Sequence, residues 1–222
     1  MEYIIKRSRR KSVSIYVTKE AKIEVHAPLK LSKTYIDNLV SEKEEWLLTH
    51  LSKMKQELQK RDTFRLENHN MVLILGSEYP ICDTSENTAV FDGASVSLPL
   101  GDFAWRKEAM IKLYKRLAHD ILPQIVEKHA SIMNVSPKSM RITSAKTRWG
   151  SCSGDNRLNF SWYLMMTPMS VIDYVVVHEL SHMLEHNHSA AFWGIVSRFC
   201  PDFQKEKQSL KVLSQRLQEE NW

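Results

Sequence analysis

The pattern His178-Glu179-Leu180-Ser181-His182 constrains this 222-residue chain more than any other feature. Two histidines four residues apart project from one face of an α-helix, where both can reach a single metal ion. The helix predicted around them begins at Thr167-Pro168, with threonine as its cap and proline in its first position. Its three consecutive valines, Val175–Val177, form isolated helices poorly because they are β-branched. We therefore expect burial in a folded core to hold this helix.

A third metal ligand has to come from outside the pentapeptide, and Glu185, His186 and His188 follow it closely. If the helix continued, Glu185 and His186 would lie about 10 and 12 Å along its axis from His178, too far to share one ion. His188 becomes reachable only if the chain reverses after the motif. Asn187 stands where such a reversal is needed, and asparagine tolerates the left-handed conformation.

Glu179 lies beside the two histidines but is not expected to bind the metal. A carboxylate there can hold and deprotonate the water that fills an open position on a zinc ion. Offsets of 0, 4 and 10 residues between histidines are those of the metzincin signature. This chain has Glu185 where metzincins have glycine, and no methionine-turn sequence follows, so a metzincin is disfavoured.

Two groups of short strands are predicted before residue 100. The first group, between residues 3 and 25, has alternating apolar positions typical of a small antiparallel meander. Ser32 would then cap one long helix that reaches about Lys60 and covers the meander. The second group, between residues 71 and 98, is assigned to the same lobe, which places the lobe boundary near residue 100.

The last part of the chain is predicted to combine helices with a hairpin. Helical spacing extends over residues 102–132, where Pro123 should kink or interrupt the pattern. The turn signal Ser153-Gly154-Asp155-Asn156 lies between two short apolar runs and predicts a β-hairpin over residues 146–162. The fold class is therefore expected to be α+β, with a lobe at 1–100 and a domain at 101–222.

Three further runs accompany the motif: Thr147-Arg148-Trp149-Gly150-Ser151-Cys152-Ser153, Val171-Ile172-Asp173-Tyr174-Val175-Val176-Val177, and Asn187-His188-Ser189 with Phe192-Trp193. With these residues the chain resembles the YgjP-like metallopeptidases, distant relatives of the SprT-like and WLM zinc-protease domains. The resemblance implies a zincin-like domain at 101–222, packed on a basic β-rich lobe at 1–100. It implies zinc bound by His178, His182 and His188, with Glu179 as the catalytic residue.

The resemblance also implies a peptide or protein substrate. The hairpin would then form the sheet edge beside the motif helix, where an extended substrate could add as a strand. Four groups could stabilise the developing oxyanion, namely Tyr163, Tyr174, His186 and Arg148, and the sequence does not choose among them. Asp173 or Glu185 could orient a ligand imidazole.

Charge keeps two other functions open. The first 61 residues hold 14 Lys or Arg and 8 Asp or Glu, whereas the remaining residues hold 17 and 18. The basic lobe could bind nucleic acid through Arg7, Arg9, Arg10 and Lys11, a role compatible with a protease that acts on DNA-associated proteins. Alternatively, basic residues near the hairpin could direct the same metal-bound water at a nucleotide phosphate; these residues are Arg141, Lys146, Arg148 and Arg157.

The lengths of the apolar runs and the number of cysteines indicate the cellular compartment. No run approaches the roughly 18 uncharged apolar residues that a membrane span needs. Cys82, Cys152 and Cys200 are odd in number and lack a CxxC pair, so neither a disulfide framework nor a four-cysteine zinc site is expected. These features predict a cytoplasmic protein with no membrane partner.

Overall fold

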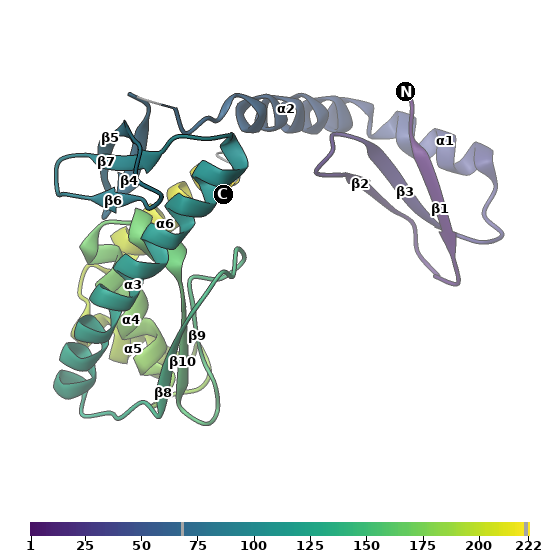
Figure 1. The fold of residues 1–222 in the computed structure, drawn as a ribbon. Coiled ribbons are helices and arrows are strands. Elements are labelled where there is room, and N and C mark those ends of the chain that lie inside the picture. The colour runs from purple at the N-terminus through teal and green to yellow at the C-terminus, as the bar shows by residue number, and fades with distance from the viewer. Residues whose placement is uncertain (68, 220–221) are drawn as a thin grey trace. The chain divides into compact units, whose positions relative to one another are not determined.

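The computed structural model describes residues 1–67, 69–219 and 222. Over these residues the fold is a mixed α+β arrangement with six α-helices and three small sheets (Figure 1). Two compact units make up the chain, residues 1–64 with 216–222, and residues 65–215. Within the described part, no helix is both long and apolar enough to span a membrane.

The first unit contains a three-stranded sheet and two helices. Its elements are β1 (Ile4–Ser8), β2 (Ser14–Val17), β3 (Ile23–Pro28), α1 (Lys33–Glu42) and α2 (Glu44–Thr63). The expected antiparallel meander is wrong, because β3 lies in the centre, parallel to β1 and antiparallel to β2. Ile23, Val25 and Ala27 alternate as buried residues along β3, and the most buried strand occupies the middle of the sheet.

The expected long helix is two helices. Ser32 caps α1 as predicted, since its hydroxyl accepts a hydrogen bond from the Tyr35 backbone N–H at 3.2 Å. The break falls at Lys43, whose backbone has φ −104° and ψ 13°, values outside the helical region. Ile36 and Val40 of α1 and Leu47 of α2 join one apolar core with β3.

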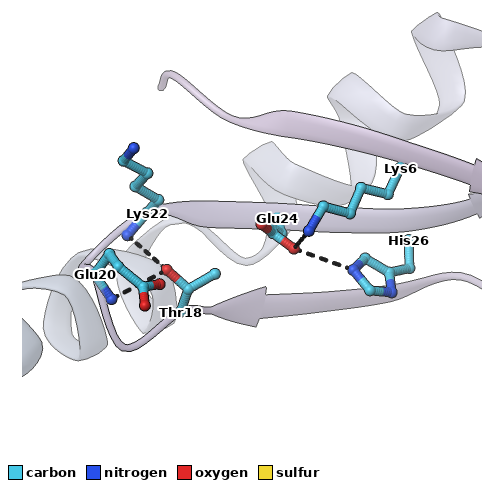
Figure 2. A network of polar contacts seen from close by, with 6 residues as sticks. All are labelled: Lys6, Thr18, Glu20, Lys22, Glu24 and His26. Carbon is cyan, nitrogen blue, oxygen red and sulfur yellow. Dashed lines mark hydrogen bonds and ion pairs between the residues drawn. The ribbon is translucent and has the colours of Figure 1, made fainter.

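Several of the N-terminal basic side chains are engaged within this unit. Figure 2 shows Glu24 between Lys6 and His26, with oxygen to nitrogen distances of 2.7 and 3.2 Å. The Arg7 guanidinium donates to three backbone carbonyls, one at the end of β3 and two in the loop that follows, and Arg10 donates to the Ser14 hydroxyl at 2.6 Å. The positive charge of this unit is therefore partly bound in local contacts.

The second unit holds two sheets and four helices. The first sheet, in the order β4-β5-β7-β6, comprises β4 (Met71–Ile74), β5 (Ser77–Thr84), β6 (Val90–Phe91) and β7 (Val96–Pro99). The other elements are α3 (Phe103–Met133), β8 (Ser139–Thr143), β9 (Gly150–Cys152), β10 (Arg157–Ser161), the 3-10 helix η1 (Trp162–Met166), α4 (Met169–Ser181), α5 (Ala190–Phe199) and α6 (Phe203–Glu219).

The strands between residues 71 and 99 belong to the second unit, not to the N-terminal lobe as expected, so the first boundary between units in the chain falls after residue 64 instead of near residue 100. Side chains of α3 explain this difference. The Tyr114 hydroxyl donates to the Leu73 carbonyl at 2.8 Å, and Arg106 donates to the Pro99 carbonyl at 3.0 Å. Arg106 also pairs with Asp83 at 2.7 Å. These contacts attach the sheet to α3.

Helix α3 matches the predicted span but not the predicted interruption. Asp102 caps its N-terminus by accepting from the Trp105 N–H at 2.8 Å, and Asn134 ends it in the left-handed region with φ 54° and ψ 48°. Pro123 lies inside the helix without ending it. The helix is amphipathic, and its buried face includes the polar residue His129.

The motif helix α4 begins one residue later than expected. Pro168 is its cap residue, while the Thr167 hydroxyl donates to the Leu164 carbonyl at 2.8 Å and does not cap the helix. Gly76, at φ +82°, approaches so closely that an added Cβ would lie 2.6 Å from Pro168 Cγ. Ser170 in the first turn donates to the buried Glu206 of α6 at 3.1 Å. Burial therefore holds this helix, as its valines indicated.

The sheet beside α4 has the order β8-β10-β9, and the predicted hairpin is the antiparallel pair β9 and β10. β9 is an edge strand, and the sheet packs against α3 and α4 (Figure 1). Leu158 and Phe160 of β10 are fully buried. Since side chains alternate along a strand, Arg157 and Asn159 occupy the opposite face.

Candidate metal centre

The chain reverses after the motif helix, as the third-ligand argument required. His182 is the C-terminal cap of α4, and the Glu185 N–H donates to the Ser181 carbonyl at 2.9 Å in a final turn. Asn187 does not take the expected left-handed conformation, since the described residues with positive φ do not include it. Instead, a tight turn forms in which the Ser189 N–H donates to the Asn187 carbonyl at 2.7 Å.

This reversal brings His178, His182 and His188 together. One nitrogen from each ring can be chosen so that all three lie within 4.8 Å of one another. The Nε2 atoms of His178 and His188 are 3.2 Å apart. Two nitrogens bound at about 2.0 to 2.1 Å to one tetrahedral zinc ion would be separated by about 3.3 Å. The observed distance fits a shared metal ion.

A buried aromatic ring lies under the three imidazoles. Phe192 of α5 is fully buried, and its ring centroid lies 4.9, 4.5 and 4.7 Å from those of His178, His182 and His188. Trp193, next in the chain, stacks on His188 at 5.8 Å. Ser189 caps α5 by accepting from the Phe192 N–H at 3.3 Å, which fixes the start of the helix that carries these rings.

Burial keeps two of the three imidazoles in the neutral form, which is the form that can bind a metal. It lowers the pKa of His178 to about 4, with further contributions from the neighbouring His182, His188 and Lys207. Burial also lowers the pKa of His182. Both rings are therefore neutral near pH 7, as a nitrogen ligand must be. Hydrogen bonds from the His182 ring to the backbone of Glu185 and His186 raise the pKa of His182 and partly oppose the effect of burial, so these two residues contact His182 without joining the three-histidine group.

Glu179 faces the edge strand β9. An added Cβ on Gly150 would lie 2.7 Å from both Cγ and Oε1 of Glu179, so the absence of a side chain there makes room for the carboxylate. Burial raises the pKa of Glu179 to about 7, while the Cys152 backbone N–H and the charge of Arg148 act in the opposite direction. The carboxylate is thus desolvated and held by a backbone donor.

The other residues considered from the sequence take different places. Asp173 bonds the buried His129 of α3 at 2.5 Å and does not orient a ligand histidine. The Tyr174 ring lies 5.9 Å from that of His178, and burial raises the pKa of this phenol to about 12. Tyr163 stacks on Trp162 at 3.9 Å.

One charged residue near the site was missed by the sequence argument. Lys207 of α6 places its Nζ 4.8 Å from the centroid of the Trp193 ring. It lies 25 residues after His182, on a separate helix, so neither spacing nor a motif indicated it. Only the packing of α6 beside α5, seen in the stacking of Phe203 on Trp193 at 5.3 Å, brings it here.

The chain is similar to known metallopeptidases in structure and in sequence pattern. The chain is similar to the crystal structure of the metallopeptidase zymogen of Pyrococcus abyssi abylysin, with 20% identity and a TM-score of 0.39 over 44% of this chain and 96% of that one. It is also similar to the metallopeptidase zymogen of Methanocaldococcus jannaschii jannalysin, with 21% identity and a TM-score of 0.35 over 40% and 96%. No curated protein matches. The model of the YgjP-like metallopeptidase domain matches residues 11–213. Since this match spans most of the chain, the protein belongs to the YgjP-like family of metallopeptidases.

Proposed function

We propose that this protein is a zinc-dependent peptidase in which His178, His182 and His188 bind the metal and Glu179 moves the proton. One observation carries the proposal: three imidazole nitrogens lie within 4.8 Å of one another, and the buried carboxylate of Glu179 is next to His178 on helix α4. The family supports a divalent metal, and three nitrogen donors that leave one position open suit zinc. A zincin-like catalytic domain within residues 101–222 is part of this proposal.

Glu179 supplies the acid-base chemistry in this mechanism. When bound, zinc would polarise the scissile carbonyl and increase the acidity of a water molecule. Glu179 accepts a proton from that water and returns it to the leaving amine. The Cys152 N–H holds the carboxylate, and its buried position keeps it basic enough to accept the proton. The charge of Arg148 lowers the pKa of the same carboxylate. The exposed side chain of Arg148 is better suited to stabilise the oxyanion than the buried Tyr163 or Tyr174.

The edge of β9 offers a place for the substrate backbone. The Ser153 N–H donates to the Arg157 carbonyl at 3.0 Å, and the Ser161 N–H donates to the Trp149 carbonyl at 2.8 Å. Hydrogen bonding alternates along an antiparallel strand, so the backbone groups of Gly150 and Cys152 face away from β10. An extended peptide adding along this edge would run beside Glu179.

The two alternatives remain predictions with less support. Arg141 and Arg157 line a pocket of about 230 Å³ together with Asn159, on the face of the sheet opposite Phe160 and Leu158. Gly150 pairs with Phe160, so a Cβ on Gly150 would point to the same face of the sheet as Phe160, and that Cβ would meet Glu179. Glu179 therefore lies on the face opposite these arginines, which are poorly placed to hold a phosphate at the candidate metal centre. Nucleic-acid binding through the N-terminal stretch would compete with the local hydrogen bonds of its arginines.

Glu179→Gln tests the function, with zinc content measured beside peptide hydrolysis. The amide keeps the size of the side chain but cannot accept the proton, so we expect zinc to be retained and hydrolysis to fall by roughly 10²- to 10⁴-fold. Glu185→Gln is the matched control, because Glu185 lies outside the three-histidine group. Undiminished hydrolysis by Glu179→Gln would refute the assigned role.

A further inference from the structure

Helix α6 brings a cation to the edge of the three-histidine group. Lys207 Nζ lies 4.8 Å from the centroid of the Trp193 ring. That ring is stacked on His188 with an interplanar angle of 24°, and its centroid is also 5.8 Å from that of His178. The ammonium group and two of the proposed ligands therefore lie against the same aromatic ring.

The side chain of Lys207 is exposed. Among residues 1–59, 64–67, 69–217 and 222, whose side chains the structure describes, no ion pair includes Lys207, and the adjacent Glu206 is buried against Ser170. The face of the Trp193 ring attracts the ammonium through its quadrupole, so this contact needs no counter-ion. Its three N–H donors remain available to an incoming acceptor.

Other cations near the site are less well placed for such a role. Arg148 precedes β9 and acts on Glu179, where the scissile bond would lie. Arg141 and Arg157 occupy the opposite face of the small sheet. Lys207 is thus the cation positioned beside the imidazoles but away from the proton-transferring carboxylate, where a group flanking the scissile bond would lie.

We propose that Lys207, held by Trp193, binds a carboxylate of the substrate and makes the enzyme prefer peptides with a negative charge on one side of the scissile bond. This inference rests on the proposed peptidase function. The carboxylate could belong to an acidic side chain or to the C-terminus of a peptide, since the chemistry of recognition is the same. The peptides used in the test separate these two sources.

Binding measurements test the inference without requiring turnover. Three peptides of one length would be titrated by calorimetry into the zinc-loaded Glu179→Gln protein: a neutral amidated peptide, the same peptide with one glutamate, and the neutral peptide with a free C-terminus. We expect one of the two carboxylate peptides to bind more tightly than the neutral one. Changing Lys207→Glu should weaken the binding of that peptide by about fivefold, the upper end for an exposed ion pair, and leave the binding of the neutral peptide unchanged.

Matched variants separate charge recognition from a structural effect. Lys205→Glu makes the same charge change on the same helix, about 200° around its axis from Lys207, and should leave all three affinities unchanged. Lys207→Arg should keep the preference, because it keeps the charge. Raising the salt concentration should reduce the preference in the parent protein, since an exposed ion pair is screened.

Hydrolysis by the zinc-loaded parent protein distinguishes the two proposals. If the neutral peptide is cleaved but Lys207→Glu weakens the binding of all three peptides equally, or of none of them, the role of Lys207 is refuted and the peptidase function stands. If no peptide is cleaved by the parent protein, the proposed function fails and this inference fails with it.

Discussion

Gly150→Ala would show how closely the proposed catalysis depends on the placement of Glu179. A Cβ at residue 150 would lie 2.7 Å from Cγ and Oε1 of Glu179 and 2.9 Å from its Cδ. Ordinary contact begins near 3.4 Å, so the carboxylate must move by about 0.7 Å. The end of a glutamate side chain can rotate away more easily than β9 can shift, since β9 is bonded to β10.

The expected effect on activity is large and the effect on stability is small. Misplacing a catalytic group by about 1 Å can cost roughly 10²-fold in rate, which corresponds to about 2.7 kcal/mol of activation free energy. An off-rotamer glutamate costs about 0.5 to 1.5 kcal/mol of folding free energy. Replacing glycine by alanine recovers about 0.4 to 1 kcal/mol through the unfolded state. The free energy of unfolding should therefore change by no more than about 1 kcal/mol.

The assay compares kcat, zinc content and melting temperature for Gly150→Ala and Gly154→Ala. Gly154 lies in the turn of the same hairpin, and an added Cβ there would meet nothing within 4 Å. We expect both variants to bind zinc, and only Gly150→Ala to lose activity. Parent-like kcat in Gly150→Ala would refute the argument that Glu179 needs this space. Loss of zinc with activity would show that the strand, not the carboxylate, had moved.

Two further predictions concern the histidine group. His188→Ala should lower the bound zinc well below one ion per chain, because it removes one of three nitrogen donors. His186→Ala is the control and should keep its zinc, since His186 lies outside the three-histidine group. Equal zinc content in both variants would contradict the ligand assignment. Phe192→Ala should reduce the free energy of unfolding by about 3 to 5 kcal/mol in urea titrations, since the ring is fully buried, and should weaken zinc binding because the three imidazoles lose their support. An unfolding free energy within 1 kcal/mol of the parent would refute this packing argument.

Local sequence patterns predicted how the three histidines of the candidate metal centre come together. His178, His182 and His188 lie together as the chain reversal required, because helix geometry and a short turn determine their placement. The hairpin β9 and β10 and the cap at Ser32 were also predicted, since both depend on neighbouring residues. The conformation at Asn187 was predicted wrongly, because more than one tight turn can reverse the chain at this point.

Long-range contacts account for what the sequence did not predict. Pairing of β1 with β3 instead of β2 depends on which strand is most buried, and neighbouring residues do not encode that order. The strands at 71–99 join the second unit through hydrogen bonds from Tyr114 and other residues of α3. Lys207 comes near the three-histidine group only through the packing of α6, so its charge could be counted from the sequence but its position could not be predicted.

The geometry of the motif helix depends on residues far from the motif. Its first turn has no side-chain cap, and its valines form isolated helices poorly. The contact of Gly76 with Pro168 places one end of the helix, and the bond between His129 and Asp173 fixes its rotation against α3 five residues before His178. An H-E-x-x-H sequence alone therefore does not guarantee a metal site. Here the site also requires the β4-β5 turn and α3, which explains why residues 65–100 form one compact unit with the helix that carries the histidines.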